Sequence, residues 1–188
     1  MPDLIPVPAL GGSAARSLRC GVLSLEENDG LALASLALRR GAARPSPLGL
    51  DLPAPGKWVG KDAVSAFWTG PDQWMVEGHG RALDDFAAEV AALCPGCSVT
   101  EQTDGFVAFD IVSAAGEPAI LALMAKLVNL DPAGFPAGSA TRTGLAHMSV
   151  FVIRRTPDRL SILAMRSAAA TVWHALETAL ARAAQAAA

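Results

Sequence analysis

The sequence predicts an α+β fold built from a duplicated β-β-α-β-β-α unit. Two pairs of matching segments support the duplication. Asp29-Gly30 precedes an apolar stretch, and Asp104-Gly105 precedes another in the second half of the chain. Pro71-Asp72 precedes a strand-like segment and then a helix-like one, as does Pro157-Asp158. Matches that recur in the same order indicate a repeat, here with a period of about eighty residues.

Length and composition are compatible with two halves packed as one domain. The 188 residues are 52% hydrophobic and only 18% charged, which supplies a sizeable core without disulfides or a structural metal. We expect an irregular N-terminal arm over residues 1–19, a first pseudo-repeat over 20–97 and a second over 98–188.

Alternating apolar residues and turn residues predict the elements of the first half. Strands at 22–26 and 31–38 flank the Asn28-Asp29-Gly30 turn, and the proline-rich segment 44–57 is a connection. A hairpin at 66–69 and 73–77 follows. A helix over 81–93 then ends the half.

The second half repeats this plan. Strands are expected at 98–101 and 106–112, with Val107, Phe109 and Ile111 on one face and Asp110 on the other. A helix at 118–127 and a Pro- and Gly-rich loop at 129–138 follow. The remaining elements are strands at 141–147, 149–154 and 159–164, a final helix capped by Ser167 with the apolar stripe Val172, Trp173, Leu176 and Leu180, and a frayed tail over 181–188.

Charge and hydropathy patterning exclude two classes of partner. The formal net charge is −3 and no cluster of Lys and Arg alternates with aromatics, so we expect no nucleic acid partner. No apolar run approaches the roughly 20 residues of a membrane helix, so we expect no membrane partner. Residues 1–10 contain an acid and three prolines, unlike a signal peptide, and we expect a cytoplasmic protein.

Motifs for cofactors, metals and catalysis are missing. Gly78-His79-Gly80 lacks the third glycine of a dinucleotide-binding loop, and neither Gly56-Lys57 nor Gly60-Lys61 precedes the Ser or Thr of a P-loop. His147 and His174 are far from His79 in sequence and lack ligand spacing. We therefore expect no catalytic, cofactor-binding or metal-binding residues on this chain.

Two constellations keep a functional alternative open. Cys94 and Cys97 have the spacing of a redox motif, but the predicted helix ends before them, where its dipole opposes thiolate formation. Asp29 and Asp104 could form a carboxylate pair related by the repeat. Aspartate before glycine is also ordinary turn chemistry, which is the interpretation we favour.

Four arginines cluster around the last predicted strands: Arg142, Arg154, Arg155 and Arg166. Arginine is enriched at protein interfaces, so we expect them to form the rim of a subunit interface. The alternative is a solvated rim, or an ion pair with Asp158.

Several motifs in fixed order resemble the gamma subunit of heterotetrameric sarcosine oxidase. Upstream are Trp-x-Gly-Pro-Asp-Gln-Trp (68–74) and Thr-Asp-Gly-Phe-Val-x-Phe (103–109). The others are Asn-Leu-Asp-x-x-x-Phe-Pro-x-Gly-x-Ala-Thr-Arg-Thr (129–143), His-Met-x-x-Phe (147–151), Val-Ile-Arg-Arg-x-x-Asp (152–158) and Arg-Ser-x-Ala-x-x-x-Trp-His (166–174). The resemblance covers roughly residues 20–180.

The resemblance implies a non-catalytic structural subunit of a bacterial complex. That complex oxidatively demethylates sarcosine to glycine, passes the methyl group to tetrahydrofolate or releases formaldehyde, and makes hydrogen peroxide. The partners would be the alpha, beta and delta subunits. FAD, FMN, NAD and tetrahydrofolate would bind in partner subunits. The implied fold is similar to the folate-binding domain of glycine-cleavage T proteins, which is itself duplicated.

A free-standing folate-binding or aminomethyltransferase-like protein is the alternative function. The chain is shorter than complete T proteins, and the Lys-Gly-Cys-Tyr-x-Gly-Gln signature of related folate-binding repair proteins is absent. A thiol-redox protein that uses Cys94 and Cys97 is the third and least favoured option.

Overall fold

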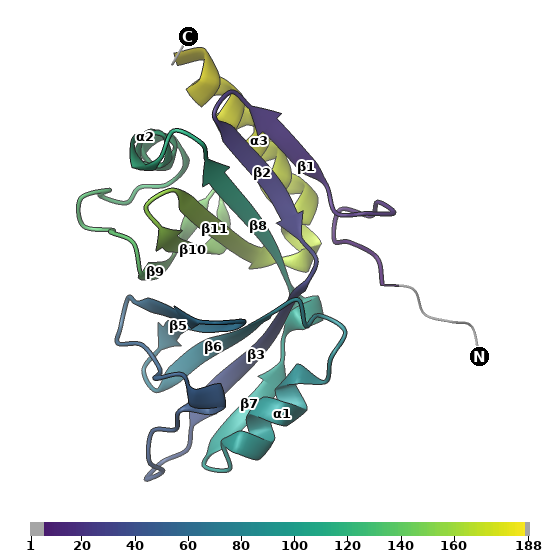
Figure 1. Cartoon of the computed structure of the whole chain (residues 1–188), viewed down its shortest axis with the longest axis vertical. Coiled ribbons are helices and arrows are strands. Elements are labelled where there is room, and N and C mark those ends of the chain that lie inside the picture. The colour runs from purple at the N-terminus through teal and green to yellow at the C-terminus, as the bar shows by residue number, and fades with distance from the viewer. Residues whose placement is uncertain (1–5, 187–188) are drawn as a thin grey trace.

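The computed structural model describes residues 6–186, which form two antiparallel sheets with helices on their outer faces (Figure 1). The helices α2 (Glu117–Leu127) and α3 (Ala169–Ala186) cover one sheet, and α1 (Phe86–Leu93) covers the other. The layers therefore run helix, sheet, sheet, helix. This confirms the predicted α+β class.

The larger sheet has six strands in the order β1-β2-β8-β11-β10-β9. All its neighbours are antiparallel. Its strands are β1 (Ser17–Cys20), β2 (Leu23–Asn28), β8 (Phe106–Ser113), β9 (Ser139–Leu145), β10 (Met148–Thr156) and β11 (Arg159–Met165).

The smaller sheet has five strands in the order β4-β5-β6-β3-β7, again all antiparallel. Its strands are β3 (Leu31–Leu38), β4 (Trp58–Lys61), β5 (Val64–Gly70), β6 (Gln73–His79) and β7 (Cys97–Glu101). Three short 3-10 turns complete the fold: η1 (Pro47–Gly49), η2 (Thr103–Gly105) and η3 (Arg166–Ala168).

The two sheets repeat one topology. The order β2-β8-β11-β10-β9 in one sheet corresponds to β7-β3-β6-β5-β4 in the other. Each half contributes its first strand to the sheet of the other half, so the chain crosses between sheets at β2–β3 and at β7–β8. Matching bulges also precede the two Pro-Asp turns, between Trp68 and Gly70 and between Arg154 and Thr156. An internal duplication would produce these features, and the duplication itself stays a prediction.

Several element boundaries differ from the sequence expectations. Strand β1 overlaps the end of the expected irregular arm, and β4, directly after the proline-rich segment, is a strand that was not expected. Helix α1 starts at Phe86 rather than at residue 81, because the Asp85 side chain caps it by accepting from the Ala88 N–H at 3.3 Å. Ser167 is not the cap of the last helix, because it lies inside η3.

Three apolar clusters hold the layers together. One packs α2 and α3 on the six-stranded sheet, and the expected stripe of Val172, Trp173, Leu176 and Leu180 is buried in it. A second packs α1 on the five-stranded sheet. The third lies between the sheets, where the Phe67 and Phe151 rings are 5.1 Å apart. Charged side chains share this last interface, and they position the candidate site.

Candidate functional site

A buried ion pair joins the two sheets. Glu77 on β6 and Arg155 on β10 face each other, and two parallel hydrogen bonds of 2.8 Å connect the guanidinium to the carboxylate. Glu77 is fully buried and Arg155 is 7% exposed. Such a bidentate pair fixes distance and orientation, so it sets how one sheet sits on the other.

The bulge in β10 accounts for the placement of Arg155. Arg154 pairs with Leu160 and Thr156 pairs with Arg159, which leaves Arg155 as the extra residue on the strand. A bulge of this kind redirects a side chain at the end of a ladder. Here the side chain points between the sheets, while that of Arg154 points to the helix layer.

A chain of polar contacts continues from Arg155 across the larger sheet. Its Nε donates to the Ser161 hydroxyl at 2.6 Å, and that hydroxyl donates to Asp110. Asp110 also accepts from Arg159 at 2.8 Å and from the Asn28 side chain at 3.0 Å. Asp110 therefore has two hydrogen-bond donors besides Ser161, and it is an internal residue of the network.

Glu77 has further donors on its own sheet. The Trp58 indole N–H donates to it at 3.1 Å, and the Ser65 hydroxyl donates to the same oxygen. The Ser65 hydroxyl also lies 3.0 Å from His79 Nε2. We call these residues the inter-sheet network: Asn28, Trp58, Ser65, Glu77, His79, Asp110, Arg155, Arg159 and Ser161.

The carboxylates of the inter-sheet network are ionised and paired, as is typical of groups that stabilise a fold. Burial would raise the pKa of Glu77, but the Arg155 charge and hydrogen bonds from Arg155, Ser65 and Trp58 hold that pKa below its ordinary value. Burial would likewise raise the pKa of Asp110, but Arg159 and Ser161 hold it low. Burial lowers the pKa of His79. Both carboxylates are paired and ionised, so neither is suited to take up a proton from a substrate near neutral pH.

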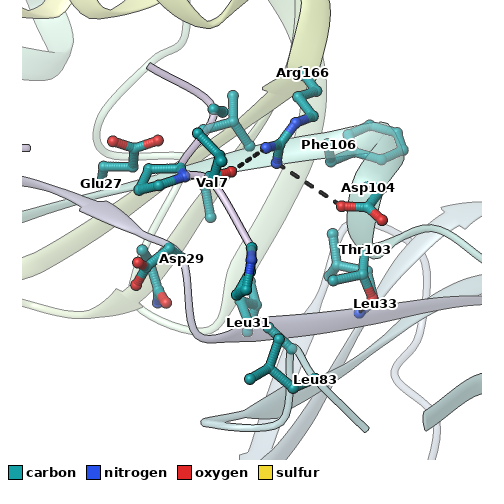
Figure 2. Close-up of a pocket in the computed structure, with 17 residues that line it drawn as sticks. Val7, Glu27, Asp29, Leu31, Leu33, Leu83, Thr103, Asp104, Phe106 and Arg166 are labelled. Atoms are coloured by element: carbon teal, nitrogen blue, oxygen red, sulfur yellow. Dashed lines mark hydrogen bonds and ion pairs between the residues drawn. The ribbon is translucent and has the colours of Figure 1, made fainter. Parts of the chain in front are cut away.

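A pocket of about 210 Å³ lies where the chain crosses between the sheets in both halves (Figure 2). We call it the crossing pocket. Strand β2, the turn into β3, η2 and the start of β8 line it, together with the N-terminal arm, Leu83 and Arg166. Asp29 and Asp104, which the repeat predicts as a related pair, both line this pocket, on opposite sides of Val7 in Figure 2.

The charged groups of the crossing pocket differ in their freedom. The Asp104 side chain is 98% exposed and lies 4.0 Å from Arg166 Nη1. Arg166 also donates to the Val7 carbonyl, so its positive charge is already engaged by the chain itself. Asp29 is exposed at the β2–β3 turn. The sequence predicts a turn at each of the two aspartates. Only the fold shows that both turns lie at one pocket.

A buried carboxylate holds the N-terminal arm against this pocket. Glu27 accepts hydrogen bonds from the backbone N–H of Leu10 at 3.0 Å and of Arg16 at 3.2 Å. The guanidinium of Arg16 lies over the Trp173 ring. Sequence reasoning missed Glu27 because it belongs to a polar run before a turn, where an exposed side chain is the usual outcome.

The structure corrects the expected arginine rim. Arg154 is 0% exposed and Arg155 is buried, so neither lies on a surface that a partner could reach. Arg154 donates to Glu117 at 3.1 Å and to the Pro157 carbonyl at 2.8 Å. Arg155 pairs with Glu77, and neither pairs with Asp158 as the alternative supposed. Both are internal partners, because the strand that carries them is covered on both faces.

The other two arginines of that group lie apart from each other. Arg142 is exposed on β9 and donates to the Ser149 hydroxyl at 2.7 Å. Arg166 lies at the crossing pocket. Their role at a subunit interface stays a prediction.

The remaining candidate residues lie in different places. Cys94 is the residue after helix α1, as the sequence predicts. Burial raises the pKa of the Cys94 thiol and of the Cys97 thiol. His147 lies in the β9–β10 turn and His174 on α3. Among residues 6–186, no group of three or more His, Cys, Asp or Glu side chains could hold a metal ion. Within the same range, no helix has both the length and the apolar character to cross a membrane.

Comparisons with known proteins identify the fold. No family model and no curated protein sequence matches the chain. Among solved structures, it is similar to a chain of heterotetrameric sarcosine oxidase from Corynebacterium sp. U-96, with a TM-score of 0.72 and 20% identity over 89% of this chain and 88% of that chain.

A second solved structure has the same fold in a longer chain. It is glycine cleavage system aminomethyltransferase T from Bartonella henselae, with a TM-score of 0.59 and 12% identity. The match covers 83% of this chain but only 45% of that protein. The fold is thus that of a sarcosine oxidase chain and of part of a glycine-cleavage T protein.

Proposed function

We propose that this chain is a non-catalytic structural subunit of a sarcosine oxidase complex, in the position of the gamma subunit. One observation carries the proposal: the similarity to a sarcosine oxidase chain extends over nearly the whole length of both chains. By contrast, the chain spans less than half of the aminomethyltransferase. The match in length therefore favours the sarcosine oxidase chain over the aminomethyltransferase as the counterpart of this chain.

The state of the buried charges supports a structural role. Glu77, Asp110 and Arg155 are paired and hydrogen-bonded within the chain. The complex would oxidatively demethylate sarcosine to glycine, with hydrogen peroxide as co-product and the methyl group passed to tetrahydrofolate or released as formaldehyde. FAD, FMN, NAD and tetrahydrofolate would be bound by partner subunits of the complex.

A free-standing folate-binding protein is the second candidate. The observation in its favour is the T-protein fold together with a pocket that has carboxylates at its rim. That pocket, at about 210 Å³, is smaller than the roughly 300–1,000 Å³ of sites that enclose a drug-sized ligand.

Co-expression with the products of neighbouring reading frames tests the two candidates. A subunit should co-purify with flavin-containing chains in a complex that oxidises sarcosine, and the isolated chain should not change its tryptophan fluorescence on addition of tetrahydrofolate. Saturable quenching by tetrahydrofolate, without any stable partner, would contradict the subunit proposal and support the alternative.

A further inference from the structure

We propose that the rim of the crossing pocket is the surface through which this chain docks on a partner subunit. The partner would insert one apolar side chain, flanked by basic residues, into the pocket. This inference rests on the proposed function, because it assumes that the chain belongs to a complex. It moves the interface away from Arg154 and Arg155, which are internal.

Two exposed apolar side chains line this pocket, and a third is next to it in the sequence. Among the described residues, six large apolar side chains are exposed: Val7, Val22, Leu83, Leu93, Val112 and Met165. Leu83 and Val7 line the crossing pocket, with exposures of 80% and 53%. Met165 precedes the lining residue Arg166 and pairs across the strands with the lining residue Phe106. Apolar surface gathered at one site indicates a binding surface, whereas single exposed residues do not.

The backbone near the most exposed of these residues, Leu83, is held in place. Leu83 belongs to a short turn before helix α1, and the N–H groups of Arg81 and Ala82 both donate to the Gly30 carbonyl. Arg81 forms ion pairs with Asp84 and Glu89 on the other side of the turn. An ordered backbone loses little conformational freedom on binding, which favours association.

The size of the pocket suits a single side chain. Leu31 and Leu33 form an apolar floor, and both are almost completely buried. Its volume of about 210 Å³ is small, and the exposed side chains of Leu83 and Val7 at its edge can exclude water from one inserted group. A central apolar anchor surrounded by a water-excluding rim is the usual arrangement of an interface hot spot.

The net charge at the rim is negative. Asp29 and Asp104 are both exposed, and Arg166, which lies 4.0 Å from Asp104 and donates to the Val7 carbonyl, balances only one of them. The Glu27 carboxylate is turned to backbone N–H groups of the arm. A partner with Lys or Arg beside its apolar anchor would complement this charge, which favours encounter and orientation.

The experiment measures the affinity of rim variants for the partner subunits, in the complex obtained by co-expression. Leu83→Arg introduces a clash and a repelling charge, and Asp104→Arg reverses a rim charge. The matched controls are Leu93→Arg, an exposed leucine on α1, and Glu177→Arg, an exposed acid on α3. Thermal melts of all four variants establish that each is folded.

We expect both rim variants to raise the Kd at least about tenfold, as hot-spot substitutions do, and both controls to stay within about twofold of wild type. The Kd of the wild type should also rise with salt, since opposite charges attract across the interface. Unchanged affinity of both rim variants would overturn the proposed surface while leaving the proposed function intact. A loss confined to Leu83→Arg, with no effect of Asp104→Arg or salt, would overturn the basic partner.

Two other outcomes would also overturn the inference. If wild-type chain does not associate with any flavin-containing neighbour, the proposed function fails and this surface fails with it. If the isolated chain forms a dimer in light scattering that Leu83→Arg dissociates, the occupant is a second copy of this chain and not a basic partner subunit.

Discussion

The halves of this protein meet at the inter-sheet network and at the crossing pocket, and these two regions differ in the exposure of their charged groups. In the inter-sheet network, Glu77 and Arg155 are buried and satisfy each other. At the crossing pocket, Asp29 and Asp104 face water. A buried charge requires a partner inside the protein, whereas an exposed one is stable without it and is free to meet another molecule. We therefore expect the first region to stabilise the fold, and we propose the second as the recognition surface.

Of the substitutions that test this comparison, Glu77→Ala should have the largest effect on the free energy of unfolding. It leaves the Arg155 guanidinium buried without its counter-charge, which costs about 3–5 kcal/mol of unfolding free energy. Urea unfolding followed by tryptophan fluorescence measures the loss. The double variant Glu77→Leu with Arg155→Met should recover much of it, since no unpaired charge remains. A loss below about 1 kcal/mol in the single variant would show that the pair does not hold the sheets together.

Arg154→Ala should have the next largest effect, compared with Arg142→Ala on the neighbouring strand. Arg154 is buried and donates to Glu117, to backbone carbonyls and to the Met124 sulfur. Its removal should cost about 2–3 kcal/mol through lost packing and unpaired acceptors. Arg142 is exposed, so its variant should unfold like the wild type. Equal effects of the two variants would contradict the assignment of Arg154 to the interior.

Acidification should weaken the network in two stages. Because burial lowers the pKa of folded His79, the unfolded chain takes up that proton first, and stability falls as pH drops below about 6.5. The pKa values of Glu77 and Asp110 are also lowered in the folded state, so their contribution is lost from about pH 5 downward.

His79→Gln distinguishes these two stages. The variant should lose the first decrease in stability and keep the second, when urea unfolding is repeated between pH 4 and 8, a range of about four units around these transitions. An identical profile in wild type and variant would show that His79 does not couple to folding.

The smallest effect on stability is expected at the crossing pocket. Asp104→Asn removes a charge whose side chain is 98% exposed, so the melting temperature should equal that of the wild type within error. The matched variant is Asp110→Asn. Asp110 is buried on β8, so this variant should have a clearly lower melting temperature. If Asp104→Asn melts as low as Asp110→Asn, the division between a stabilising and a recognition region is wrong.

Local patterns predicted most of the fold. The apolar stretch at 31–38 is a strand over those residues, and the alternation around Asp110 gives the two faces of β8 correctly. Predictions failed where the reason was not local. Arg154 and Arg155 belong to a strand whose charged end looks solvated in sequence, but sheet packing and a bulge bury both.

The candidate site was predictable only in part. The Asp-Gly turns at 29–30 and 104–105 are visible as a repeat, but their meeting at one pocket depends on the exchange of first strands between the sheets. Glu77 and Asp110 lie in sequence segments without any motif. Their pairing with Arg155 and Arg159 is set by contacts between residues that are far apart in the chain.

Native mass spectrometry of the co-expressed complex tests most directly whether this chain is a structural subunit. We expect one copy of this chain in each complex with flavin-containing partners. We also expect the chain released in the gas phase to have the mass of the polypeptide alone. A sarcosine-oxidising complex that forms without this chain, or a released chain that retains a bound flavin or folate, would contradict the structural role.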